Sequence, residues 1–163
     1  MGTRLWTESM IRKAFPHLKY VRVHTAGRNS AAIYAWDENL ELPDTDRVRL
    51  KRFAAGYLPF YLCCQVKPYS AVQEDGVPPV TDPPEPVAQA AMNRSLNQEA
   101  IVGLINGMLE GGRMKFERYD GWTGTIHFSV RPGGAVTEIE KELIRQYLYE
   151  VVPIGSYYDI AYP

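Results

Sequence analysis

The sequence predicts an α+β protein made of two tandem α-β-β-α-β units joined by a proline-rich connector. Amphipathic helix patterns and alternating strand patterns follow one another in the same order over residues 1–68 and again over residues 97–163. Five of the twelve prolines fall between Pro78 and Pro86, within the connector of residues 69–96. A shift of 93 residues, or of 94 from the second helix onward, places apolar positions of one unit on those of the other.

The first unit opens with a short helix that we expect Thr7 to cap and Pro16 to end. A hairpin follows, with strands from Tyr20 to Thr25 and from Ala31 to Trp36. The next helix ends before Pro59, and its apolar positions recur at helical spacing: Leu50, Phe53, Ala54 and Tyr57. The last strand runs from Phe60 to Lys67, and its apolar side carries Phe60, Leu62, Cys64 and Val66.

The connector, residues 69–96, is expected to be an extended and semi-rigid spacer, because proline favours polyproline II geometry. A short helix is predicted from Pro86 to Arg94. If this segment is ordered, it must be held against another surface.

The second unit repeats the order of elements. Asn97 is a good helix cap, and glycines at 111 and 112 follow that helix. A turn at Asp120 joins two alternating strands, and Thr137 with Glu140 forms a capping box that opens the next helix. The chain finishes with a strand from Ser156 to Tyr162.

This agreement predicts an internal duplication, although two α+β halves with similar connection lengths could also agree by chance. Each unit has the ferredoxin-like arrangement short of its first strand. Three strands leave open edges and a thin core. The units should therefore complete each other, either in one six-stranded sheet within the chain or by lending strands to partner subunits.

Charge is divided between the halves. Residues 1–68 carry 11 basic and 6 acidic side chains, and residues 69–163 carry 7 basic and 13 acidic ones. Two matching helices carry opposite rows of charge: Arg47, Arg49, Lys51 and Arg52 in one, and Glu138, Glu140, Glu142 and Glu150 in the other. These rows are either ordinary solvated faces or complementary surfaces, between the halves or between copies packed head to tail.

Tyrosine is enriched in buried contact patches, and the terminal strand is rich in it, although tyrosine also favours strands in general. We therefore predict a set of partner-binding residues: Arg47, Arg49, Arg52, Glu138, Glu142, Tyr157 and Tyr158.

Several classes of protein are not indicated. The net charge of −1 argues against nucleic acid and against an acidic membrane surface as partners. Cys63 and Cys64 are adjacent, so they point to opposite faces of a strand and suit neither a disulfide nor a metal site. The sequence contains no phosphate-binding loop, nucleophile elbow or metal-ligand spacing, and we expect no cofactor. The N-terminus lacks the apolar core of a signal peptide, and we expect a protein made inside the cell.

An alternative is a small two-histidine phosphoesterase acting on a linear or cyclic nucleotide phosphodiester. His127 and Ser129 stand in the His-x-Ser pattern of those enzymes, which are duplicated proteins with one such motif per half. The first half offers only His24, followed directly by Thr25, which points to the other face. The pair is not symmetric in the repeat, so an enzyme is the less favoured interpretation. A third interpretation is a binding module with a concave, aromatic-lined pocket between the halves.

The last forty residues carry a glycine-containing turn after a strand, a Glu-rich capped helix, and the run Val152-Pro153-Ile154-Gly155 before the final strand. This region resembles the C-terminal domain of baseplate J family wedge proteins of contractile phage tails. The resemblance covers about a quarter of the chain, which lacks the long N-terminal region of those proteins. It implies a scaffolding role, with no catalytic residues to carry over. We therefore expect a structural protein of a phage tail, baseplate or related injection particle, which binds other subunits or copies of itself and is located in the virion or assembled particle.

Overall fold

The structure, a computed structural model, describes residues 2–58, 62–79, 82–132 and 136–163. The first unit contains α1 (Arg4–Ala14), β1 (Tyr20–Gly27), β2 (Ser30–Trp36), α2 (Asp44–Tyr57) and β3 (Cys63–Lys67). The connector carries α3 (Ala71–Glu74) and α4 (Glu85–Met92). The second unit contains α5 (Gln98–Met108), β4 (Gly112–Asp120), β5 (Thr125–Pro132), α6 (Glu138–Val151) and β6 (Tyr157–Ala161). The predicted α+β class and the order of elements in each unit are confirmed.

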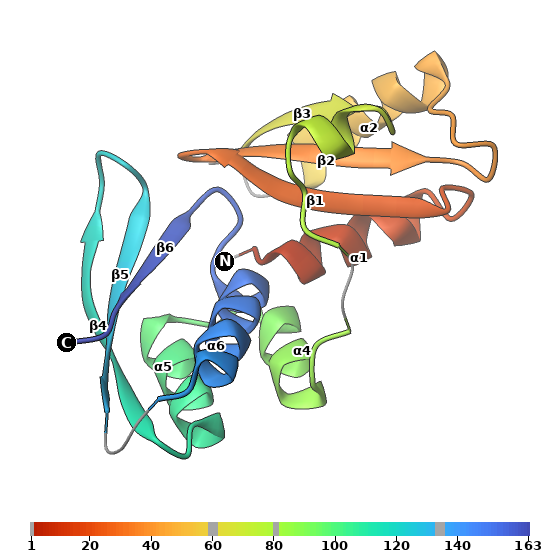
Figure 1. Ribbon diagram of the computed structural model, residues 1–163. Coiled ribbons are helices and arrows are strands. Elements are labelled where there is room, and N and C mark those ends of the chain that lie inside the picture. The colour runs from red at the N-terminus through yellow and green to blue at the C-terminus, as the bar shows by residue number, and fades with distance from the viewer. Residues whose placement is uncertain (1, 59–61, 80–81, 133–135) are drawn as a thin grey trace.

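Each unit has its own sheet, in the orders β1-β2-β3 and β4-β5-β6 (Figure 1). The hairpin strands pair antiparallel, and the last strand lies parallel beside the second hairpin strand. Each helix between the second and third strands is therefore the crossover of a β-α-β unit. The two sheets remain separate in the described part of the chain, so a six-stranded sheet within the chain is not formed.

The repeat is closer in the structure than in the sequence alignment. The bounds of α1 and α5, of α2 and α6, and of β3 and β6 all differ by 94 residues. Ile11 therefore corresponds to the equally buried Ile105, and not to Leu104 as the shift of 93 predicted. Matching lengths in three separate element pairs support the internal duplication.

The hairpins do not match without a gap, which corrects the alignment. Val23 pairs with Ile33 in the first unit, whereas Phe116 pairs with Phe128 in the second. The second turn is longer by two residues, so Ile33 corresponds to Phe128 and not to Ile126. A change of two residues keeps every side chain on its face of the strand, which is why the apolar pattern still agreed.

The helix caps follow the sequence, with one exception. The Asn97 side chain accepts from the Ala100 N–H at 2.9 Å, and Thr137 accepts from the Glu140 N–H at 3.1 Å. Thr3, and not Thr7, caps α1, because Thr3 has extended backbone and accepts from the Trp6 N–H at 3.2 Å. Thr7 lies inside the helix, where its hydroxyl donates to the Thr3 carbonyl at 2.7 Å.

Each unit has a hydrophobic core between its sheet and its helices, and a side chain of the other unit packs on each core. Ile154, which precedes β6, is buried in the core of the first unit, and Leu5 of α1 packs on the core of the second. The Gly2 carbonyl accepts from the Ile154 N–H at 2.8 Å, and Thr3 forms a β-bridge with Pro153. Figure 1 accordingly places the N-terminus between the units.

The connector is held against the chain itself, as predicted for an ordered segment. In α4, Val87 and Ala91 are buried in the second core, and the helix contacts both α1 and α6 (Figure 1). Near α3, Val72 and Val77 pack on the outer face of the first sheet, beside Trp36.

The predicted strand start at Phe60 and helix stop at Pro59 lie outside the described residues. No helix in the described part of the chain is long and apolar enough to cross a membrane.

Candidate functional sites

The basic row on α2 forms part of a surface hollow. Arg49 and Arg52 are exposed and, with Ala14, Phe15, Phe53 and Tyr57, line a hollow of about 300 Å³. The Arg49 guanidinium lies 5.5 Å from the centre of the Phe15 ring, and Phe53 stacks on Tyr57. Tyr57 is 68% exposed. This surface, which we call the α2 hollow, combines the residue types that dominate binding at protein interfaces. Arg47 lies on the same helix but is half-buried and does not line the hollow.

The acidic row on α6 is partly neutralised by bases of the same helix. Glu138 pairs with Lys141 at 3.1 Å, and Glu142 pairs with Arg145 at 2.6 Å. Beside these carboxylates Ile139 is 75% exposed, and Leu143 is also exposed. We call Glu138, Ile139, Glu142 and Leu143 the α6 face. Surface pairs of this kind contribute little stability, so their carboxylates can exchange partners.

The two tyrosines of β6 lie on opposite faces of the strand. Tyr157 is exposed, whereas Tyr158 packs on the second core and its hydroxyl donates to the Arg145 carbonyl at 2.8 Å. Burial raises the pKa of Tyr158 to about 12, so the hydroxyl stays protonated as a donor. Tyr158 and Glu142 line one cavity, described below, which the arginines of α2 do not reach.

The three histidines occupy separate environments. His24 Nδ1 lies 3.0 Å from the Tyr149 hydroxyl, and His17 Nε2 lies 3.0 Å from Asp46. His127 Nδ1 lies 3.6 Å from Asp159 on the neighbouring strand β6. Ser129 donates to Glu117 at 2.5 Å, so its hydroxyl is already engaged. His24 lines a cavity between the units and His127 lines neither of the two cavities found there.

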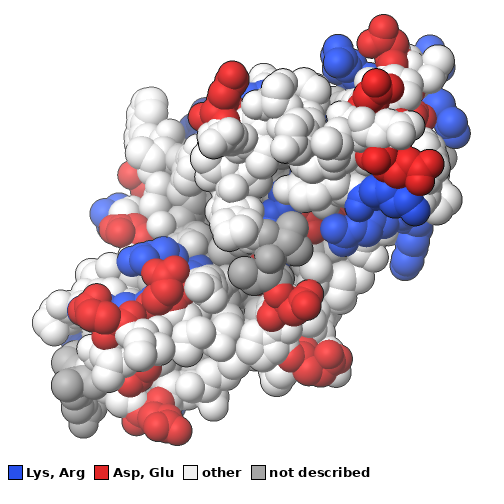
Figure 2. Space-filling view, turned by 45° about the vertical axis from the view of Figure 1, so that its right-hand side comes forward, with Lys and Arg blue, Asp and Glu red and all other residues white. Residues whose placement is uncertain are grey.

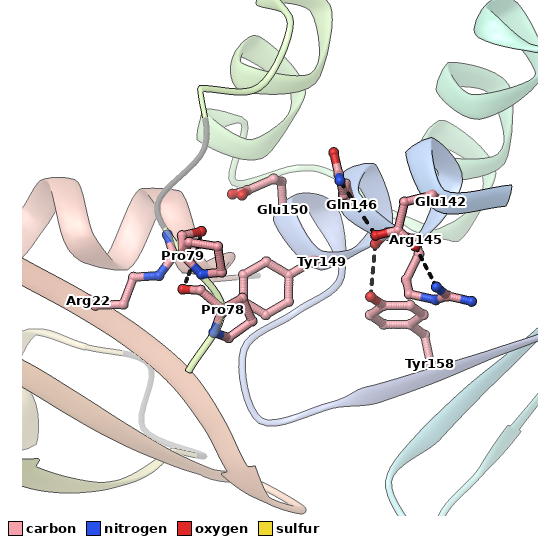
Figure 3. A pocket seen from close by; sticks show the side chains of 9 residues that line it. All are labelled: Arg22, Pro78, Pro79, Glu142, Arg145, Gln146, Tyr149, Glu150 and Tyr158. Atoms are coloured by element: carbon pink, nitrogen blue, oxygen red, sulfur yellow. Dashed lines mark hydrogen bonds and ion pairs between the residues drawn. The ribbon is translucent and has the colours of Figure 1, made fainter. Parts of the chain in front are cut away.

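Two adjoining cavities lie between the units, with volumes of about 240 and 380 Å³. They share four lining residues: Pro78, Arg145, Tyr149 and Tyr158. We call them together the inter-unit groove. Arg22, Pro79 and Glu150 line the smaller cavity (Figure 3). His24 and Tyr157 line the larger one. The groove has the aromatic lining that the third interpretation, a binding module, required.

A cluster of buried charges forms the floor between the units. Arg4 of α1 pairs with Glu8 at 2.6 Å and with Glu150 of α6, and all three side chains are almost completely buried. Glu8 also accepts from the Val23 N–H at 2.8 Å. The guanidinium groups of Arg4 and Arg22 lie 5.3 and 5.5 Å from the centre of the Tyr149 ring. Among the described residues, Arg4 with Glu150 is the ion pair that joins the two α-β-β-α-β units, and it involves none of the basic side chains of α2.

Burial governs the titration of this cluster. It raises the pKa of Glu150 despite the nearby Arg4 charge, and it raises the pKa of Tyr149 to about 12. Burial, followed by the positive charge of Arg22, lowers the pKa of His24. At neutral pH His24 is therefore held in its neutral form, and Tyr149 is a neutral phenol.

The sequence did not single out Arg4, Arg22, Tyr149 or the Pro78-Pro79 pair. The only available signal was the alternation in β1, which places Arg22 and His24 on the face opposite Val21 and Val23. Nothing local indicates that the connector covers that face.

Metal-binding clusters are absent from the described part of the chain, where no three His, Cys, Asp or Glu side chains come together. The cysteines are free thiols, and burial raises the pKa of Cys64 to about 11. That value keeps Cys64 as a thiol at neutral pH, which disfavours both metal binding and nucleophilic attack.

No family model matches the sequence, and no curated protein matches it. Similar solved structures include the periplasmic domain of the T3SS inner membrane protein PrgH from S. typhimurium, in two fragments. The fragment of residues 170–392 has a TM-score of 0.34 and 14% identity, over 96% of this chain and 68% of that chain. The fragment of residues 170–362 has a TM-score of 0.35 and 15% identity, over 98% and 69%. TM-scores this low support no inference about the function of this chain.

Proposed function

We propose that this chain is a structural subunit that builds a larger particle through protein-protein contacts, in a phage tail, baseplate or related injection machine. Such a subunit would be made in the cytoplasm and would reside in the virion or assembled particle. The observation that carries the proposal is the α2 hollow, in which exposed arginines and aromatic rings surround a depression on the first unit.

The α6 face on the second unit complements this hollow. It offers two carboxylates, Glu138 and Glu142, beside the exposed apolar side chains of Ile139 and Leu143. Arginines opposite carboxylates, with an apolar side chain entering an aromatic hollow, are the contacts that give an interface both orientation and affinity. In the visible face of Figure 2, basic side chains gather toward the right-hand end of the first unit, and acidic ones prevail on the second.

The two surfaces lie on different units, so each surface needs the other one, and not a second copy of itself, as its partner. The described residues contain no ion pair between α2 and α6. Unless a two-fold axis makes the contact reciprocal within a dimer, an α2 hollow that binds the α6 face of the next copy extends the contact into a ring or a filament. This geometry suits a component of a multi-subunit particle.

The proposal is tested by sedimentation velocity of the whole chain at low and high salt. We expect concentration-dependent assembly at low salt that weakens as salt screens the charged contacts. The double variant Arg49→Glu with Arg52→Glu should remain monomeric. A control with the same charge change, Lys19→Glu with Arg113→Glu, should assemble as the unmodified chain does. A monomer under all conditions that also binds no tail or baseplate protein would contradict the proposal.

The phosphoesterase alternative stays a prediction. It requires His24 and His127 to act as acid and base on one phosphodiester. Hydrolysis of a cyclic nucleotide that is lost in both His24→Ala and His127→Ala would replace the structural interpretation.

A further inference from the structure

Arg22 is a buried arginine without an acidic partner. It lies on β1, on the face opposite the core, and is only 1% exposed. Its Nη2 donates to the carbonyls of Pro78 and Pro79 at 3.3 and 3.2 Å, while Nε and Nη1 have no hydrogen-bond partner among the residues that the structure describes. No carboxylate of the described residues lies within 4.0 Å of its guanidinium. Burial of a guanidinium with unused donors is unfavourable, and an acceptor brought to it would recover that free energy.

The nearby carboxylates are already committed. Glu8 accepts from Arg4 and from the Val23 N–H, and Glu150 accepts from Arg4. Arg4 and Arg22 carry two positive charges, and Glu8 and Glu150 carry two negative ones. Glu142 also lines the smaller cavity, where it pairs with Arg145. A monoanion at the Arg22 donors adds one negative charge to this neutral cluster, whereas a phosphate dianion adds two and meets more repulsion from Glu142 and Glu150.

The space next to Arg22 suits a flat apolar group. Figure 3 shows Arg22 and the two prolines on one side of the smaller cavity and α6 on the other, with the Tyr149 ring between them. Tyr158 closes the side toward β6, where the larger cavity continues. Tyrosine rings favour offset or edge contacts with another aromatic ring. The combined volume of the groove lies in the range of small-molecule sites.

We propose that the inter-unit groove binds a small aromatic monocarboxylate. The carboxylate accepts hydrogen bonds from the unused donors of Arg22, and the ring lies against Tyr149 and Tyr158. Charge-assisted hydrogen bonds of this kind are stronger than neutral ones, and the surrounding rings keep water from weakening them. This inference goes beyond the assembly function and does not depend on it: none of the groove residues belongs to the α2 hollow, and Glu142 is the one residue that the groove shares with the α6 face.

Isothermal titration calorimetry of the whole chain with benzoate tests the proposal. We expect saturable binding with a Kd on the order of 1 mM or tighter. Benzamide has the same shape without the charge, and it should bind at least about tenfold more weakly. Inorganic phosphate should not compete. Arg22→Gln should weaken benzoate binding at least about tenfold, whereas Arg49→Gln, far from the groove, should leave it unchanged.

If Arg22→Gln does not fold, the unmodified protein offers a second measurement. In NMR spectra of arginine Nε–H groups, benzoate should shift the assigned Arg22 resonance and saturate with the calorimetric Kd. Equal binding of benzamide, an unshifted Arg22 resonance, or no saturable binding up to about ten times the expected Kd would each overturn the proposal. Loss of assembly in the Arg49 and Arg52 variant would leave this result untouched, so the two proposals fail separately.

Discussion

Arg4 lies at the buried junction between the two units. It joins α1 to α6 by bridging Glu8 and Glu150, and all three side chains are almost completely buried. A buried pair is not by itself a source of stability, because both charges lose their hydration. Removing one partner is different, because the charge that remains is buried and uncompensated.

The variant Arg4→Met leaves buried Glu150 without its base and leaves buried Glu8 with only Arg12, at 3.8 Å. We expect it to lower the free energy of unfolding by about 3–5 kcal/mol, measured by urea denaturation. Arg12→Met is the matched control, since Arg12 lies on the same helix, faces the same Glu8 at 3.8 Å and is half exposed. It should cost about 1 kcal/mol or less. Equal losses for the two variants would show that Arg4 holds no special position.

His24 should make stability depend on pH. Its pKa in the folded protein is lowered from 6.5 by burial and by Arg22. The unfolded chain therefore takes up a proton first as the pH falls through about 6.5, and the folded state loses stability below that pH. The contribution of one group is limited to about 1.4 kcal/mol per pH unit. Urea denaturation of His24→Gln between pH 7.5 and 5.5 should give a flatter dependence than that of the unmodified chain, and an identical slope would contradict the assignment.

At the scale of elements, the sequence predicted what is local. Strand alternation and helical spacing placed every helix and strand of both units, and Asn97 and Thr137 were correctly predicted as caps. Thr7 is a residue type that suits a cap, but Thr3 has the extended backbone of the cap and forms a β-bridge with the distant Pro153, which the local sequence does not indicate. The hairpin register was misplaced by two residues because a longer turn does not alter the alternation.

Gly155 shows how tightly the elements of the two units meet. Its φ is +85°, its N–H donates to Thr25 Oγ1 at 3.0 Å, and its carbonyl accepts from the Asn29 N–H at 2.8 Å. A Cβ at this position would lie 2.9 Å from Leu62 Cδ1 and 3.1 Å from Asn29 Cα. The first hairpin turn and the approach to β6 therefore fit together only with glycine here.

Gly155→Ala should lower the free energy of unfolding by at least about 1–2 kcal/mol, from the left-handed backbone alone. Gly103→Ala is the control, because Gly103 lies inside α5 with no atom near the added methyl group. That substitution should raise stability by about 0.5–1 kcal/mol. Thermal or urea denaturation of both variants distinguishes them by the sign of the change. A neutral or stabilising Gly155→Ala would contradict the tight junction.

At the scale of the molecule, the sequence could not predict how the units dock. Periodicity reports which face of an element is apolar, but not which distant segment covers it. The connector and α6 cover the outer face of β1, so that Arg22 and Tyr149 come together from positions far apart in the chain. The charge division was visible in the sequence. In the structure Glu150 points inward and pairs with Arg4, whereas most of the other charged side chains of α2 and α6 lie on the surface.

Head-to-tail assembly through the α2 hollow and the α6 face can be tested by exchanging the charges of the two surfaces. One variant carries Arg49→Glu and Arg52→Glu, and the other carries Glu138→Lys and Glu142→Lys. Each variant alone has two like-charged surfaces and should sediment as a monomer. An equimolar mixture pairs reversed α2 hollows with reversed α6 faces and should assemble as the unmodified chain does. Assembly of either variant alone, or a mixture that stays monomeric while the unmodified chain assembles, would contradict the claim.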